Sequence, residues 1–291
     1  MATRSSQSAT DRADEKKLIA AAQAGDRRAL DTLIRRYQGQ VLRFGRRLCG
    51  DPHDAEDVLQ ETFLAMARSL GGYQGKAALS TWLYTVARSF CIKKRRRRKD
   101  APAHVESIDE LLPGQQRALV DPDRRPDDRL EASQVQAALD RAIAGLDPKY
   151  REVLVLRDVE GLTAPEVGSV LGLTIEAVKS RLHRAREQVR DQVAPALGLA
   201  LAPASGARCQ HTAGLFSRYL EGEIDAVTCA TMQKHVAECP HCSTVCQSLK
   251  QTLAMCNQSG KKSAPVPHAI QLAVKDAVRA YLAGAATSRR G

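Results

Sequence analysis

Apolar residues recur at three- and four-residue steps through most of the chain, and this spacing predicts α-helices. Between residues 51 and 70 the apolar positions are Ala55, Val58, Leu59, Phe63, Met66 and Leu70. Asp51 precedes Pro52, which together supply an N-cap and a proline at the first helical position. A second stripe follows Ser80 and consists of Leu83, Val86, Ala87 and Phe90. We expect an all-α fold.

The same period extends toward the N-terminus, where the apolar positions are Leu30, Leu33, Ile34, Tyr37, Val41, Phe44 and Leu48. Gly25 and Asp26 separate this helix from a shorter apolar segment at 18–22. Residues 1–17 are polar, and we expect a disordered tail there. The first helical domain is therefore predicted at 18–99.

A second helical domain is predicted at 134–196, after a flexible linker at 100–133 that contains four prolines and no sustained period. Asp147 before Pro148 marks one helix start, and Thr163 with Glu166 forms a capping box. The short helix ends at Gly172, and Thr174 caps a longer one whose inward residues are Val178, Leu182, Ala185 and Val189. The turn between these two helices contains only about three residues, including Gly172. Two helices joined by such a turn predict a helix-turn-helix, whose second helix enters the DNA major groove.

The outward positions of that second helix are polar: Glu176, Lys179, Ser180, His183, Arg184 and Arg186. Such side chains can contact base edges or phosphates. The candidate DNA-binding residues are Glu176, Lys179, Ser180, Arg181 and Arg184, of which Arg181 borders the buried face. The simpler interpretation is an arginine-rich surface helix that only improves solubility.

The charge of the chain favours a polyanionic partner. The 291 residues carry a formal net charge of +11. Eight Lys or Arg occur between residues 88 and 99, and they continue the helix that begins at Ser80. A basic helix beside a glycine-containing loop and aromatic side chains suits single-stranded DNA, although such a run is also common on a solvated face. The candidate contacts are Tyr73, Trp82, Arg88, Lys93, Lys94 and Arg95.

The sequence offers no membrane anchor, because no apolar run approaches the ~18 residues that a spanning helix needs. Residues 1–17 have no apolar segment of the secretory type either. We expect a cytoplasmic protein that does not bind membranes, and no pattern of catalytic residues indicates an enzyme. Cys49 and Cys91 lie on or beside apolar stripes and are interpreted as small core residues.

Six of the eight cysteines fall between residues 209 and 256, after a linker at 197–206. In a reducing compartment such a cluster indicates metal binding rather than disulfides. His235, Cys239 and Cys242 have the spacing H-x3-C-x2-C, and Cys209 is the natural fourth ligand of a tetrahedral zinc ion. We therefore predict a metal-binding domain at 207–257, with a purely structural zinc site as the open alternative.

Cys229, Cys246 and Cys256 exceed what one tetrahedral site requires. Cys242 and Cys246 are four residues apart and share a helix face, so we include all three cysteines among the candidate metal ligands. Surplus thiolates favour soft ions, and the imidazole among the ligands favours a borderline ion. The predicted regulatory metal is Zn(II) or Cd(II), with Cu less expected. His211 and His241 are weaker candidates.

Two segments resemble the extracytoplasmic-function (group 4) sigma factors of bacterial RNA polymerase. DAEDVLQETFLAMARSL followed by STWLYTVARSFCIKKRRRR is similar to their region 2, and AVKSRLHRAR is similar to their region 4 recognition helix. The resemblance implies that the helix at 51–70 binds the β′ clamp of core RNA polymerase, with the candidate residues Asp54, Glu56, Asp57, Gln60 and Glu61. It also implies that the loop at 71–80 and the next helix capture the melted −10 strand, and that residues 174–189 recognise the −35 duplex.

The cysteine-rich segment resembles the zinc-binding anti-sigma fold, a small helical domain that masks a sigma factor. A sigma factor that carries such a domain at its C-terminus is similar to the CorE-type metal-dependent sigma factors. This chain departs from them, because it has Cys209-Gln210-His211 where that group has a C-x-C pair. The resemblance implies control by metal in cis, without a separate anti-sigma factor. Two alternatives remain: a thiol-redox switch, and a structural zinc or docking module on a plain DNA-binding regulator.

The tail at 258–291 contains one more amphipathic helix, with Ile270, Val274, Val278 and Tyr281 on one face. Packing against another domain is its expected use, and a membrane-surface helix is the alternative. The promoter, the target genes and the physiological metal do not follow from the sequence, nor does the sign of the metal effect.

Overall fold

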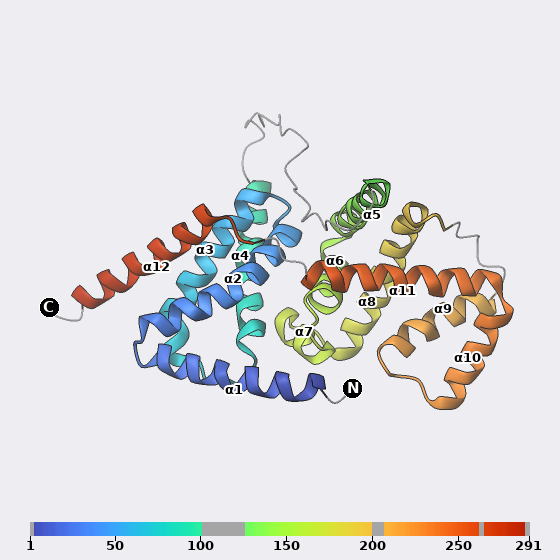
Figure 1. Cartoon of the computed structure of the whole chain (residues 1–291), viewed down its shortest axis with the longest axis horizontal. Helices are drawn as coiled ribbons and strands as arrows, with labels where there is room; N and C mark the ends of the chain where they lie inside the picture. Colours follow the sequence, from blue (N-terminus) through green and yellow to red (C-terminus); the bar gives the residue numbers. More distant parts are fainter. Residues whose placement is uncertain (1–2, 101–125, 200–206, 262–264, 289–291) are drawn as a thin grey trace. The chain divides into compact units, whose positions relative to one another are not determined.

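The computed structural model describes residues 3–100, 126–199, 207–261 and 265–288, and every regular element in these ranges is helical (Figure 1). The all-α prediction is therefore confirmed. The chain forms two compact units: residues 1–106 with 263–291, and residues 107–262. Most of the predicted linker at 100–133 and most of the linker at 197–206 lie outside the described residues.

The helices of the first unit are α1 (Thr3–Gln23), α2 (Arg27–Cys49), α3 (Pro52–Ser69), the short 3-10 turn η1 (Leu70–Gly72), α4 (Leu79–Asp100) and α12 (His268–Ser288). Those of the second unit are α5 (Pro126–Gly145), α6 (Pro148–Leu154), the π-helical segment η2 (Val155–Val159), α7 (Ala164–Leu171), α8 (Ile175–Val193), the 3-10 turn η3 (Ala194–Leu197), α9 (Ala207–Leu220), α10 (Ala226–Glu238) and α11 (Pro240–Lys261).

In the first unit, α2, α3 and α4 pack around one core. The predicted stripes supply it, with Phe44, Leu59, Phe63, Met66 and Leu83 at or below 1% exposed. Asp51 caps α3 by accepting hydrogen bonds from the amides of His53 and Asp54, as its position before Pro52 predicts. The core holds α3 and the basic helix α4 side by side.

The chain is helical well before residue 18, where we expected the first domain to begin. α1 starts at Thr3 and packs against α2. Once the apolar turn at 18–22 has formed, nucleation is complete and each further residue that is fixed adds one hydrogen bond, so the helix extends through polar sequence. At its end, Gln23 donates hydrogen bonds to the carbonyls of Leu70 (3.0 Å) and Tyr73 (2.8 Å). α1 thereby anchors the loop that precedes α4.

Cys49 and Cys91 are buried, as expected, but they are bonded to each other. Their Cα atoms are 5.1 Å apart, and the disulfide joins the end of α2 to the middle of α4. Each stripe placed one cysteine in the core, and the helical spacing alone did not show that the two face each other.

α12 packs on α3 and belongs to the first unit, although it follows the second unit in the sequence. Val274 and Val278 are buried at 1% and 4% exposed. Lys275 pairs with Asp31 of α2 at 3.5 Å, and the guanidinium of Arg68 lies 5.2 Å from the ring centre of Tyr281. The predicted apolar face is thus a packing face.

In the second unit, α5, α6, α7 and α8 form the helix-turn-helix and its support. The predicted starts are confirmed: Asp147 caps α6, the Thr163–Glu166 capping box opens α7, and Thr174 caps α8. Gly172 ends α7 with a φ of 66°, in the left-handed region that favours glycine. A Cβ on Gly168 would lie 2.8 Å from the carbonyl oxygen of Leu173, so the tight turn requires glycine there too.

The cysteine-rich helices share the second unit with the helix-turn-helix. α11 packs against α8, η2 and α5, while α9 and α10 pack on α11 (Figure 1). The approach is so close at Gly260 that a Cβ there would overlap the carbonyl oxygen of Val159. In the described residues, no helix is long and apolar enough to cross a membrane.

Candidate metal centre and nucleic-acid interface

Four predicted ligands meet at one point. The thiols of Cys209, Cys239 and Cys242 and the imidazole of His235 place one ligand atom each within 4.8 Å of one another. The Cys209 sulfur lies 3.9 Å from Nε2 of His235 and 3.9 Å from the Cys239 sulfur, and the Cys242 sulfur lies 3.3 Å from the same Nε2.

These distances fit a tetrahedral zinc ion. Ligands bound at about 2.0–2.3 Å in a tetrahedron are about 3.3–3.8 Å apart, close to the separations between these side chains. Three sulfurs and one nitrogen are also a donor set that zinc prefers. The residues present therefore fit a structural or regulatory zinc ion.

The ligands come from three helices and one junction. Cys209 lies in the first turn of α9, His235 in the last turn of α10, and Cys242 near the start of α11. Cys239 is the C-cap of α10, and its amide donates to the carbonyl of His235 at 2.9 Å. The same three helices share a small core of Phe216, Met232, Cys246 and Leu249. An ion bound here would tie α9, α10 and α11 together.

The thiols differ in acidity. The backbone amide of Cys242 lowers the pKa of Cys239, whereas burial raises the pKa of Cys242 to about 12. A cation among the four ligands favours the thiolate at both positions, because metal binding displaces the thiol protons.

The surplus cysteines lie outside this cluster. Cys246 is 3% exposed in the small core, where burial raises its pKa to about 11. Cys256 is fully buried and Cys229 is half-buried. The structure brings none of the three to the four-ligand cluster. Cys242 and Cys246 both lie in α11, as predicted, but Cys246 packs in the small core, whereas Cys242 joins the metal cluster.

The predicted DNA-binding residues lie along α8. Glu176, Ser180 and Arg184 are exposed, while Lys179 and Arg181 are half-buried. Arg184 donates to the hydroxyl of Tyr150 at 3.3 Å, and this hydrogen bond lowers the pKa of Tyr150. All five residues are on the surface of the helix that a helix-turn-helix presents to the major groove.

Arg186, which we expected to point outward, is instead 3% exposed. It donates to Asp158 through Nε (2.9 Å) and Nη2 (2.6 Å), and Nη2 also donates to Glu221 at 2.6 Å. The helical period correctly placed Arg186 off the main stripe, but the α9 end of the cysteine-rich domain covers that side of α8. Asp158 and Glu221 supply the opposite charges that a buried guanidinium requires.

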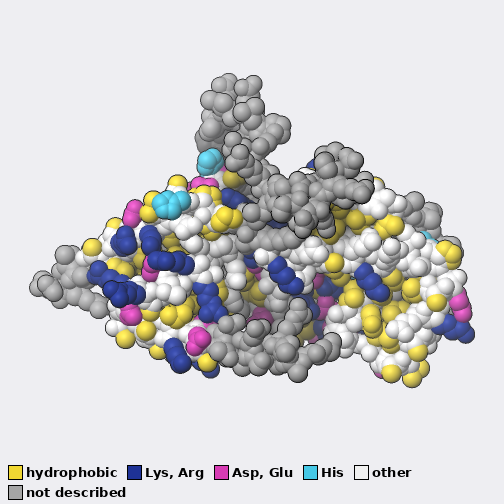
Figure 2. Space-filling model, in the orientation of Figure 1, with side chains coloured by type: hydrophobic (Ala, Val, Ile, Leu, Met, Phe, Trp, Pro, Cys, Tyr) yellow, Lys and Arg dark blue, Asp and Glu magenta, His cyan; other side chains and the backbone are white. Residues whose placement is uncertain are grey.

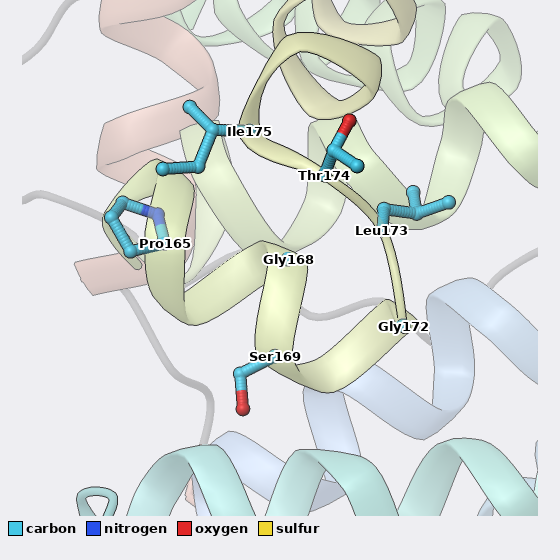
Figure 3. Close-up of a pocket in the computed structure, with 7 residues that line it drawn as sticks. All are labelled: Pro165, Gly168, Ser169, Gly172, Leu173, Thr174 and Ile175. Atoms are coloured by element: carbon cyan, nitrogen blue, oxygen red, sulfur yellow. The ribbon is translucent and has the colours of Figure 1, made fainter.

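One apolar residue at the start of α8 is exposed, and the sequence analysis assigned it no role. Ile175 is 38% exposed and borders a shallow depression over the helix-turn-helix turn. Figure 3 shows Ile175 and Pro165 at one end of this depression and Leu173 and Gly172 at the other. An apolar side chain at the N-terminus of a recognition helix suits contact with a thymine methyl group.

In the first unit, the predicted polymerase-binding and DNA-binding residues contact each other. Lys94 of α4 forms an ion pair with Asp57 and lies 3.7 Å from a carboxylate oxygen of Asp54. Asp54, one of the candidate clamp-binding residues, is buried at 7% exposed, whereas Glu61 is exposed and Glu56 and Gln60 are half-buried.

The remaining candidates surround the loop and α4. Trp82, Arg88 and Arg95 are half-buried, and Lys93 is exposed. Tyr73 donates a hydrogen bond to the carbonyl of Ala77 across the loop, and burial raises its pKa. Lys and Arg side chains also gather on the part of the first unit that carries α2 and α12 (Figure 2).

Three family models match the chain in order. Residues 33–101 match Sigma-70 region 2, residues 136–189 match Sigma-70 region 4, and residues 209–243 match a putative zinc-finger. The first covers α2 to α4, the second covers the helix-turn-helix, and the third contains all four clustered ligands.

Curated relatives agree with these matches. The chain is 35% identical over 173 residues to the ECF RNA polymerase sigma factor SigE of Mycolicibacterium smegmatis, covering 58% of this chain and 65% of SigE. It is 32% identical to the RNA polymerase sigma-H factor of Pseudomonas aeruginosa, covering 63% of this chain and 95% of that factor. It is 29% identical to SigW of Bacillus subtilis, covering 61% of this chain and 96% of SigW.

Among solved structures, the chain is similar to CnrH in complex with the cytosolic domain of CnrY, with a TM-score of 0.43, 28% identity and coverage of 61% of this chain and 95% of CnrH. Both sigma regions occur in family order, and the sigma-H factor is matched over nearly its whole length. The chain belongs to the extracytoplasmic-function sigma factors of bacterial RNA polymerase and carries a zinc-finger domain after region 4.

Proposed function

We propose that this sigma factor directs core RNA polymerase to its promoters in the cytoplasm, and that metal binding to residues 207–257 controls its activity in cis. The observation that carries the proposal is the four-ligand cluster, which lies in a domain packed directly on the helix-turn-helix. Zinc-finger domains of this kind often mark anti-sigma factors, which supports a masking role within the same chain.

The DNA and polymerase contacts are assigned as follows. α3 binds the β′ clamp through its outward acidic side chains, and the loop at 71–80 with α4 captures the melted −10 strand. Gln23 supports this role, since its hydrogen bonds to Leu70 and Tyr73 fix one end of the loop. α8 recognises the −35 duplex, where Ile175 adds a thymine contact to the polar residues.

The metal is Zn(II) or Cd(II) rather than copper, because three thiolates and an imidazole suit a borderline to soft divalent ion. When bound, the ion supplies a cross-link among α9, α10 and α11. It shifts the equilibrium between the masked and free factor by the difference of its affinities for the two states. We propose that the metal-bound state is the active one and that no separate anti-sigma factor is required.

Transcription by the purified full chain with core polymerase tests this proposal. RNA synthesis is measured against added Zn(II), Cd(II) and Cu, with the wild type, Cys242→Ser and the matched control Cys229→Ser, whose sulfur lies outside the cluster. We expect Zn(II) or Cd(II) to increase transcription in the wild type and the control, and to have no effect in Cys242→Ser. Equal transcription under all conditions would leave the domain as a structural module.

A redox switch is the second candidate, because the sulfurs of Cys209 and Cys239 are only 3.9 Å apart. Without metal, peroxide could oxidise these two thiols to one disulfide, with the two electrons and two protons reducing the peroxide to water. A response to peroxide that persists in metal-free protein would favour this candidate over metal control.

A further inference from the structure

The turn between α9 and α10 spans residues 221–225 and contains three carboxylates, Glu221, Glu223 and Asp225. Asp225 caps α10 by accepting hydrogen bonds from the amide and hydroxyl of Thr228. Glu221 and Glu223 flank Gly222, and we call residues 221–223 the acidic turn. We propose that the acidic turn docks on α8 and competes with the DNA backbone for Lys179. This inference rests on the proposed function, in which α8 binds the −35 duplex. The DNA-binding surface of α8 then has two alternative partners, a segment of the same chain and the phosphates of DNA.

Glu221 is the anchor of the acidic turn. One carboxylate oxygen accepts from Arg186 at 2.6 Å, and the other accepts from Arg157 at 2.7 and 3.1 Å. The Glu221 side chain is 10% exposed, and these contacts join the cysteine-rich domain to both η2 and α8. Burial alone would raise the pKa of Glu221, but the charge of Arg186 and the hydrogen bonds outweigh it and lower that pKa.

Glu223 holds the competing contact. Its carboxylate lies 2.8 Å from Nζ of Lys179, one turn after the start of α8. The Lys179 side chain is 39% exposed and that of Glu223 is 24% exposed, so this pair is at the rim of the interface. A carboxylate oxygen offers an ammonium group the same anionic hydrogen-bond acceptor as a phosphate oxygen.

The two contacts therefore differ in function. The buried Glu221 contacts position the turn, whereas a partly exposed ion pair such as Glu223–Lys179 exchanges readily with other anions. A phosphate that approaches Lys179 meets the negative charge of Glu223 and must displace it. Gly222 permits this geometry, because its φ of 72° lies in the left-handed region.

Binding of the full-length chain to a random-sequence DNA duplex tests the competition without knowledge of the promoter, because phosphate contacts are independent of sequence. The dissociation constant is measured by fluorescence anisotropy over a range of salt concentrations. The variants are Glu223→Gln, Lys179→Gln and the double variant. Glu238→Gln is the matched control, since Glu238 is an exposed residue of α10 and its substitution changes the net charge equally.

We expect Glu223→Gln to bind DNA severalfold more tightly than Glu238→Gln and to steepen the slope of log affinity against log salt by about 0.9, the value for one additional phosphate contact. The double variant lacks the lysine that contacts phosphate, so it should show neither the tighter binding nor the steeper salt slope of Glu223→Gln. Equal affinity and slope for Glu223→Gln and Glu238→Gln would overturn the competition. If the double variant binds DNA as tightly as Glu223→Gln alone, Lys179 does not contact DNA. That result would count against α8 as the DNA-binding helix, and thus against the proposed function.

Discussion

Substitution of Glu221 by alanine should release the acidic turn from region 4. The substitution removes the acceptor of three hydrogen bonds from two guanidinium groups, while Arg186 keeps both bonds to Asp158. Hydrogen bonds to charged groups each contribute about 1.5–3 kcal/mol and are not additive, so we expect a total loss of about 2–3 kcal/mol in docking of the turn. This corresponds to a roughly 30- to 150-fold rise in the population of the open state.

Amide hydrogen exchange measured by mass spectrometry provides the assay, because it reports local opening without requiring two-state unfolding of a multidomain chain. The amides of Gly222 and Glu223 donate to the carbonyls of Tyr219 and Arg218, and these amides should exchange faster in Glu221→Ala. Glu238→Ala should leave them unchanged. Unaltered exchange in Glu221→Ala would show that the buried ion pairs do not hold the turn.

The same contact should depend on pH. The folded state lowers the pKa of Glu221, so its contribution is fully present above the unfolded pKa of about 4.3 and is lost as the pH falls through the folded pKa. The protection factors of the turn amides, which are corrected for the pH dependence of intrinsic exchange, should therefore fall on acidification of the wild type, and the contribution of Glu221 to this fall should be absent in Glu221→Ala. Equal acid sensitivity in both proteins would exclude Glu221 as the titrating group.

Three further predictions concern other parts of the fold. Cys242→Ser should lower zinc affinity in competition with a chromophoric chelator, whereas Cys229→Ser should retain one zinc ion per chain. Gly260→Ala should destabilise the packing of α11 on η2 by about 1–3 kcal/mol, because the added Cβ would overlap the backbone of Val159. Gly214→Ala in α9 has open space around its Cβ and should be neutral or stabilising by up to about 1 kcal/mol. Urea unfolding followed by circular dichroism and by amide exchange compares the two variants. Val278→Ala should cost about 1–3 kcal/mol in docking of α12 and make α12 more sensitive to limited proteolysis.

The helices and their ends could be predicted because their signals are local. Capping by Asp51, Asp147, Thr163 and Thr174 depends on residues within one turn, and each of these caps is present. The four-ligand cluster was predictable for the same reason, since three ligands lie within eight consecutive residues. Only Cys209 required a long-range inference.

The sequence could not predict which distant segment packs on each polar helix face. Arg186 lies 35 residues from Glu221, and Arg157 lies 64 residues from it, so no local pattern connects these charges. A helical period gives the direction of Arg186 but not the domain that covers it. Cys246 shows the converse, because a thiol in a cysteine-rich helix can serve as a small hydrophobic core residue and need not bind metal.

The metal cluster and the acidic turn are connected through the same two helices. α9 carries Cys209 in its first turn and ends immediately before Glu221, and α10 carries His235 and begins three residues after Glu223. An ion that fixes α9 and α10 relative to α11 therefore constrains both ends of the turn that contacts Lys179 and Arg186. If DNA displaces the turn, linkage requires DNA and metal to change each other's affinity by the same factor.

The zinc affinity of the full chain, measured with and without saturating duplex, should shift in the wild type by the factor that zinc imposes on DNA binding. That shift should shrink in Glu221→Ala, in which the turn no longer couples the two sites.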